Sequence, residues 1–138
     1  MTNETNTRGE VTIDLDARYV MRPSYEAIEA IENQTGRGVV ALVNLAAQNE
    51  MRMSEAAIIV TECIKAWGKQ QIAAGDVSAE AKSAAGASVK KVAELIYEAG
   101  LFAATQRAGL VLMAAATGGV TASGEWKPAT EKLTPDAG

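Results

Sequence analysis

The sequence predicts a mainly α-helical α+β protein in which an N-terminal β-hairpin is followed by a bundle of four to five helices. Apolar residues alternate with polar ones over residues 10–22, which is the period of a half-buried strand. From residue 24 onward they recur every three or four positions, the period of an amphipathic helix. The composition agrees, because 27 of the 138 residues are Ala, a strong helix former, and only 3 are Pro.

The expected hairpin covers residues 10–22. In its first strand, acidic or hydroxyl residues alternate with three apolar ones, Val11, Ile13 and Leu15. Residues 16–18 (Asp-Ala-Arg) are typical of a turn, and residues 19–21 (Tyr-Val-Met) form a second extended run. This run ends before Pro23, because proline lacks the N–H that a sheet ladder needs. We therefore expect an antiparallel pair of short strands.

Five helical segments are expected after the hairpin, at about residues 24–35, 39–47, 54–67, 88–99 and 101–117. Ser24 can cap the first of them, and Gly36 can end it in a left-handed conformation. Gly68 weakens the third segment near its end. Residues 68–88 hold only two large apolar side chains among Gly and Ala, so they are either a frayed helical connector or a mobile loop.

Both ends of the chain are polar. Residues 1–8 show no apolar run after a basic start, which argues against a secretory signal, so we expect a disordered lead-in. Residues 118–138 are rich in Gly, Ser, Thr and charge and are expected to form a disordered tail. The remainder, residues 9–117, has the size of one globular domain. A single Cys fits a reducing, cytoplasmic setting.

The composition excludes several kinds of active site. The chain has no His, which rules out Ser-His-Asp, Cys-His and HExxH chemistry, and its one Cys, Cys63, cannot build a Cys-rich zinc site. Several carboxylates are spaced as solvated faces rather than as a catalytic pair or a cation site: Asp14 and Asp16, and Glu26, Glu29 and Glu32. We expect no catalytic residue, no cofactor and no metal.

Charge and hydropathy also limit the partners. With 17 acidic and 13 basic residues the formal net charge is −4, so the chain carries no basic footprint for nucleic acid. The most apolar segment, residues 101–117, is shorter than the roughly 20 residues that cross a bilayer, and it contains Arg107. Neither nucleic acid nor a membrane is an expected partner.

The segment at residues 101–117 is nevertheless a candidate for protein binding. Its large apolar side chains lie on every side of the helix, so it is either central in the bundle or covered on its second face by another chain, a second copy included. In the second case the binding residues are Leu101, Phe102, Leu110 and Met113. Trp126, an isolated indole in a polar stretch, is either an anchor for a partner or a tolerated tail residue.

Several short motifs occur in order over residues 8–117. The first group comprises Arg8-Gly9-Glu10-Val11-Thr12-Ile13, Met21-Arg22-Pro23-Ser24-Tyr25, Ala27-Ile28, Ile31-Glu32 and Thr35-Gly36-Arg37-Gly38. The second comprises Met53-Ser54-Glu55 and Ile96-Tyr97-Glu98-Ala99-Gly100-Leu101. In this combination they resemble the tail assembly chaperone family of phages and gene transfer agents, small tail proteins encoded near the tape measure gene.

The resemblance implies a non-enzymatic helper in the cytoplasm of the bacterial host. Such a helper would bind the long, largely helical tape measure protein, and other tail proteins with it, and keep it soluble during tail assembly. An Ala-rich surface with shallow contacts suits the reversible binding of an apolar helix. The residues that we expect to make this contact are Leu101, Phe102, Leu110 and Met113, with Trp126 from the tail.

Two other functions stay open. The main alternative is a structural tail component, such as a tube or terminator subunit retained in the particle, since the hairpin could add a strand to a neighbouring subunit. The other is a small enzyme that uses Ser, Lys or carboxylates. No constellation of residues in the sequence favours that enzyme.

Overall fold

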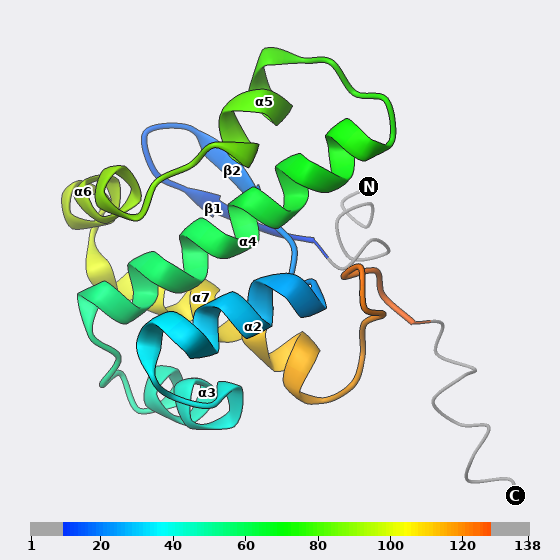
Figure 1. Ribbon diagram of the computed structural model, residues 1–138. Coiled ribbons are helices and arrows are strands. Elements are labelled where there is room, and N and C mark those ends of the chain that lie inside the picture. The colour runs from blue at the N-terminus through cyan, green and yellow to red at the C-terminus, as the bar shows by residue number, and fades with distance from the viewer. Residues whose placement is uncertain (1–9, 128–138) are drawn as a thin grey trace, which may run out of the picture.

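The structure, a computed structural model, describes residues 10–127 and begins with the expected hairpin. Strands β1 (Val11–Asp14) and β2 (Arg18–Met21) form a two-stranded antiparallel sheet. Six helices follow within this range, namely α2 (Tyr25–Thr35), α3 (Val39–Ala47), α4 (Met53–Ala73), α5 (Ala79–Ala85), α6 (Val89–Ala99) and α7 (Leu101–Ala116). The molecule is mainly α-helical with an N-terminal hairpin, which confirms the predicted fold class (Figure 1).

Helix α4 is the centre of the fold. Its 21 residues contact α2, α5, α6, α7 and β2, and Figure 1 shows it crossing the domain between α2 and α5. Residues 59–64 are buried without interruption, which requires that this part of the helix is covered on all sides. Cys63 is among them, with a side chain that is fully buried.

The hairpin packs one face against this core. The register pairs Asp14 with Arg18, so residues 15–17 form the turn, one position earlier than expected. Alternate side chains are buried, as the period of two requires. These are Val11, Ile13 and Met21.

The stretch at residues 68–88 is mainly helical, with short loops at residues 74–78 and 86–88. Helix α4 continues through Gly68 to Ala73, and α5 follows after a short loop. At Gly68 the two helices cross so closely that an added Cβ atom would lie 2.7 Å from the Ala81 carbonyl oxygen. The glycine that weakens an isolated helix therefore permits α4 and α5 to pack together. For this reason the described range contains six helices rather than four to five.

Residues 118–127 differ from the expected disordered tail. An isolated β-bridge joins Val120 to Trp126, and the Ala122 carbonyl accepts a hydrogen bond of 2.7 Å from the Tyr25 N–H at the start of α2. The first N–H groups of a helix have no partner within that helix, so this return segment satisfies one of them. The expected lead-in, residues 1–8, lies outside the described residues, and so does the rest of the expected tail, residues 128–138.

Candidate protein-binding surface

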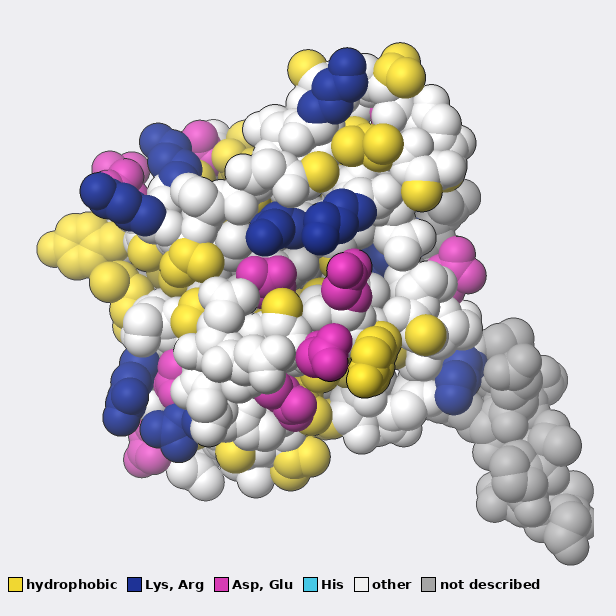
Figure 2. Space-filling view, in the orientation of Figure 1, with side chains coloured by type: hydrophobic (Ala, Val, Ile, Leu, Met, Phe, Trp, Pro, Cys, Tyr) yellow, Lys and Arg dark blue, Asp and Glu magenta, His cyan; other side chains and the backbone are white. Residues whose placement is uncertain are grey.

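Charged side chains of both signs are mixed on the face of the molecule shown in Figure 2. Lys side chains lie over α4, and the acidic side chains of α2, a helix with three Glu and no Lys or Arg, lie beside them. On this face Glu62 accepts a hydrogen bond of 2.7 Å from the Gln34 side chain and lies 3.7 Å from the Lys65 ammonium. Opposite charges are therefore neighbours where the acidic side chains of α2 meet the Lys side chains of α4.

The described residues offer no grouped metal ligands and no reactive thiol. Within residues 10–127, no group of three or more His, Cys, Asp or Glu side chains could hold a metal ion. Burial raises the pKa of the Cys63 thiol and the charge of Glu62 raises it further, so the nucleophilic thiolate is disfavoured. In the same range, no helix is both long enough and apolar enough to cross a membrane.

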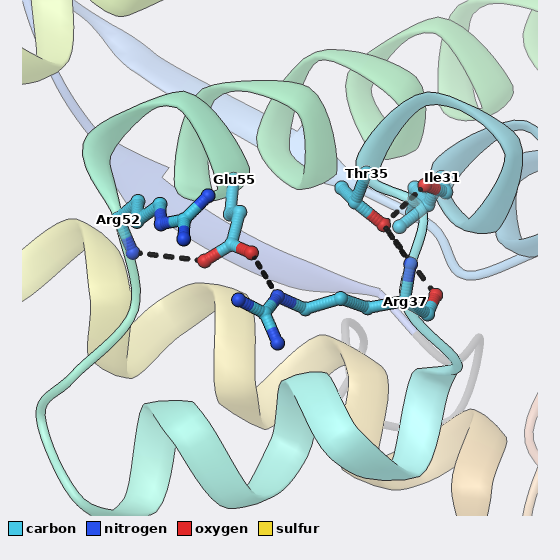
Figure 3. A network of polar contacts seen from close by, with 5 residues as sticks. All are labelled: Ile31, Thr35, Arg37, Arg52 and Glu55. Carbon is cyan, nitrogen blue, oxygen red and sulfur yellow. Dashed lines mark hydrogen bonds and ion pairs between the residues drawn. The ribbon is translucent and has the colours of Figure 1, made fainter.

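The motifs that carry the family resemblance connect helices and strands of the fold. Figure 3 shows the motif at the turn between α2 and α3. Thr35 Oγ1 donates to the Ile31 carbonyl at 2.8 Å and accepts from the Arg37 N–H at 3.2 Å. Between them, Gly36 has a φ of 74°, the left-handed conformation that ends α2. The turn directs the Arg37 side chain toward the start of α4 (Figure 3).

There the Arg37 guanidinium meets the buried carboxylate of Glu55. Arg37 Nε donates to Glu55 Oε2 at 2.5 Å, and Glu55 Oε1 accepts from the Arg52 N–H at 3.0 Å (Figure 3). Burial alone would raise the pKa of Glu55, but the Arg52 amide and the Arg37 guanidinium favour its charged form, so this pKa lies below its ordinary value. Glu55 therefore caps α4 and joins it to the α2–α3 turn, which is a structural role.

Arg22 and Ser24 have similar roles at the start of α2. The Arg22 guanidinium lies 2.9 Å from the Glu10 carboxylate, and the Arg22 backbone N–H donates to the Cys63 carbonyl of α4 at 2.9 Å. Ser24 Oγ accepts from the Ala27 N–H at 3.1 Å and so caps α2. These motif residues position helices, and a binding surface has to be sought elsewhere.

An exposed apolar surface lies where α6 passes into α7 and continues along α7. We call it the α6–α7 face and define it by four exposed side chains, Tyr97 (76% exposed), Phe102 (60%), Leu110 (52%) and Met113 (45%). The last three follow helical spacing and share one side of α7. The opposite side of α7 is buried against α3 and α4. Figure 2 shows hydrophobic side chains projecting from the molecule at the α6–α7 junction.

Three of the five predicted partner-binding residues, Phe102, Leu110 and Met113, belong to this face. Leu101 is half-buried and packs against the core. Trp126 is half-buried in the return segment beside Gly119, and its indole N–H has no hydrogen-bond partner among the described residues. Since α7 is buried on one side only, it is not the central helix of the bundle. That these residues bind a partner stays a prediction.

A second surface, which sequence reasoning missed, is an apolar groove of about 660 Å³ between the hairpin and helices α4, α5 and α6. Large apolar side chains from three elements line it, namely Tyr19, Ile64, Trp67, Val92 and Leu95. These residues are far apart in the sequence, and one wall is formed by α5, where no stable helix was expected. The available signal was Trp67, a large side chain at the end of an apolar helical pattern.

Comparison with known proteins finds one family. A family model described as phage tail tube protein, GTA-gp10, matches residues 8–104, which include the hairpin and every helix up to the first turn of α7. Neither the curated proteins nor the solved structures yield a match.

Proposed function

We propose that this chain, which belongs to the phage tail tube protein, GTA-gp10, family, is a tail assembly chaperone of the tape measure protein. In this role it binds the tape measure protein and keeps it soluble until the tail tube forms around it. The matched family is one of tail proteins and not of enzymes.

The observation that carries the proposal is the exposed α6–α7 face. Large apolar side chains left in water along one side of a helix are typical of a surface that another protein covers. Polar side chains lie beside them, since Gln106 and Arg107 are exposed on the same helix. A narrow strip of this kind suits weak contacts with an apolar helix, which can later be released.

The size of this face favours a transient contact over a permanent one. Obligate interfaces bury roughly 2,000 Å² or more, and a subunit that closes a ring needs two complementary interfaces. The α6–α7 face consists of four large side chains on one edge of the molecule. A contact through this face alone therefore suits a helper better than a tube subunit.

Co-expression with the tape measure protein tests the proposal. The tagged wild-type chain should capture the tape measure protein and raise its soluble fraction. A variant that combines Phe102→Ser, Leu110→Ser and Met113→Ser should lose most of both effects, because the apolar contact area is removed. The matched control combines Ile72→Ser and Val77→Ser, which are 43% and 79% exposed and lie outside this face.

Two results would contradict the proposal at different levels. If the wild-type chain captures no tape measure protein, the chaperone function is wrong. If the triple variant keeps its helical circular dichroism spectrum and captures as much as the control variant, the function stands but the α6–α7 face is not its site.

The name of the family, phage tail tube protein, favours a second candidate, a tube or terminator subunit that stays in the particle. Mass spectrometry of purified particles distinguishes the two functions. A chaperone should be absent or far below the amount of the structural proteins, whereas a tube subunit should be among the most abundant proteins.

A further inference from the structure

The apolar groove has a strand edge along one wall. Arg18, Tyr19 and Val20, three consecutive residues of β2, all line it. Consecutive side chains point to opposite faces of a sheet, so a groove that touches all three runs along the edge of the strand and not over one face. Strand β1 pairs with the other edge, and Figure 1 shows β2 on the side that faces α5.

The backbone groups on this edge of β2 are unpaired. Within residues 10–127, no hydrogen bond joins the backbone of Arg18, Tyr19 or Val20 to an element other than β1. One residue after β2, the Arg22 backbone N–H donates a hydrogen bond of 2.9 Å to the Cys63 carbonyl of α4. An open strand edge is a template for pairing with another strand.

We propose that the groove binds an extended segment of another protein, which adds to β2 as a third strand. The backbone of the segment pairs with the edge of β2, and its alternate side chains pack onto the apolar walls. A groove of about 660 Å³ lies within the range of sites that enclose a ligand or a short peptide. The wall opposite β2 comes from α5 and α6 and includes Ala84, Ala87, Val92 and Leu95.

Residues 1–9 and 128–138 of this chain are unsuitable occupants of the groove. Residues 1–9 contain no large apolar side chain after Met1. Residues 128–138 contain one, Leu133, and they also contain Pro128 and Pro135, each of which lacks the N–H of a ladder. Neither stretch has the alternation that fills successive positions along a strand.

Charge at the rim predicts that the segment carries a carboxylate. Arg18 lines the groove but is paired with Asp14 at 2.9 Å. Lys91 also lines it and forms no ion pair with any described residue. An acidic side chain of the added strand is therefore favoured near Lys91, and it is disfavoured near Glu80 on the α5 side of the groove.

This groove is distinct from the α6–α7 face. Lys91, Val92 and Leu95 line the groove from one side of α6, and helical spacing places Tyr97 on another side. The groove also takes an extended chain, whereas the proposed contact on α7 is with a helix. The two surfaces can therefore be tested separately.

The test uses the full chain and a capped, fluorescently labelled heptapeptide with Val at four alternate positions and Thr, Glu and Thr between them. Fluorescence anisotropy should show saturable binding with a Kd below about 1 mM. Amide hydrogen exchange should slow in the complex at those residues of 18–20 whose N–H groups face away from β1, because these groups become paired.

Two N-methylated forms of the same peptide test whether it binds as a strand. Neighbouring residues of a strand direct their N–H groups to opposite edges, so methylation of alternate amides blocks one edge at a time. The form methylated on the edge that faces β2 should lose binding. The form methylated on the other edge should bind like the parent peptide.

Two variants with matched controls locate the site. Ser83→Trp places a large ring in the groove from an exposed position of α5 and should weaken binding about tenfold or more. Its control is Lys82→Trp, because Lys82 is also exposed on α5 but does not line the groove. This control should leave binding unchanged. Lys91→Glu should weaken binding about threefold or more, and Lys90→Glu should have little effect. Thermal unfolding shows that each variant is folded.

Several outcomes would overturn the proposal. These are the absence of saturable binding to the wild-type chain, equal binding of both methylated peptides, and undiminished binding to a folded Ser83→Trp variant. If a rising concentration of the protein itself displaces the peptide, a second copy is the occupant, and the proposal is overturned as well.

Discussion

The two ends of α4 are joined to their neighbouring helices by different forces. At its start, α4 is joined to the α2–α3 turn by polar contacts, in which Glu55 binds the Arg37 guanidinium and the Arg52 amide. Toward its other end, α4 crosses α5 in close contact at Gly68. A polar junction needs particular side chains at particular positions, whereas a close crossing needs only that a side chain be missing.

This difference determines how visible each junction is in the sequence. Thr35, Gly36, Arg37 and Glu55 all belong to the motifs that carry the family resemblance. By contrast, Gly68 and the Ala residues of α5 look like a weak, featureless stretch. Substitutions at the two junctions should therefore lower the free energy of unfolding by different amounts.

The largest effect is expected at the close crossing. Gly68→Val should lower the free energy of unfolding by about 3 kcal/mol, because the new side chain overlaps the backbone of α5. Chemical denaturation measures the loss. Gly86→Ala is the control, since its nearest neighbour would be the Lys82 carbonyl oxygen at 3.7 Å, and it should change stability by less than about 0.5 kcal/mol. Equal stability of the two variants would contradict the crossing.

A smaller loss is expected at the polar junction. Glu55→Gln keeps the shape of the side chain but removes the charge that binds Arg37, so it should cost about 1–2 kcal/mol near neutral pH. Glu94→Gln, on an exposed position of α6 that forms no ion pair with a described residue, should cost almost nothing. A Glu55→Gln variant as stable as the Glu94→Gln variant would show that the ion pair does not stabilise the fold.

The polar junction should also depend on pH, in a direction that follows from the lowered pKa of Glu55. A carboxylate whose pKa is lower in the folded state contributes stability that is fully present above its unfolded pKa and is lost as the pH falls through its folded pKa. The difference between wild type and Glu55→Gln should therefore shrink below about pH 4.5, the ordinary value for Glu. Denaturation at a series of pH values measures it, and a constant difference would contradict this assignment.

The smallest effect is expected at the cap of α5. Ser78→Ala removes the oxygen that accepts from the Ala81 N–H at 3.1 Å and should cost about 0.5–1 kcal/mol, because packing against α4 still positions the helix. Ser83→Ala, on the same helix but not a cap, is the control and should be neutral. If Ser78→Ala costs as much as Gly68→Val, capping and not packing positions α5.

Elements with strong local patterns were predictable. The segments expected at residues 24–35, 39–47, 88–99 and 101–117 differ from α2, α3, α6 and α7 by at most one residue at either end. Their apolar spacing and their capping residues act within a few positions of the chain, so the sequence contains the whole cause. Helix α5 and the return segment at residues 118–127 have weak patterns of their own and depend on contacts with α4 and α2.

The candidate binding surfaces were likewise predictable only where the pattern is local in the sequence. Phe102, Leu110 and Met113 could be named from the sequence because a helix that is apolar on every side leaves one side without a partner in a small bundle. Which side stays exposed depended on how α7 packs against α3 and α4, and Leu101 lies on the packed side. The groove could not be predicted, because its walls come from the hairpin and three helices.

The sequence by itself determined the class of the fold, the hairpin, most of the helices, the absence of His-dependent chemistry and the motifs that resemble a tail protein family. These features follow from residue types and from spacings of a few positions. Tertiary structure alone decided that α4 continues through Gly68, that residues 118–127 return to α2, and that an open strand edge faces an apolar groove. Each of these depends on residues far apart in the chain, whose contact no local spacing specifies.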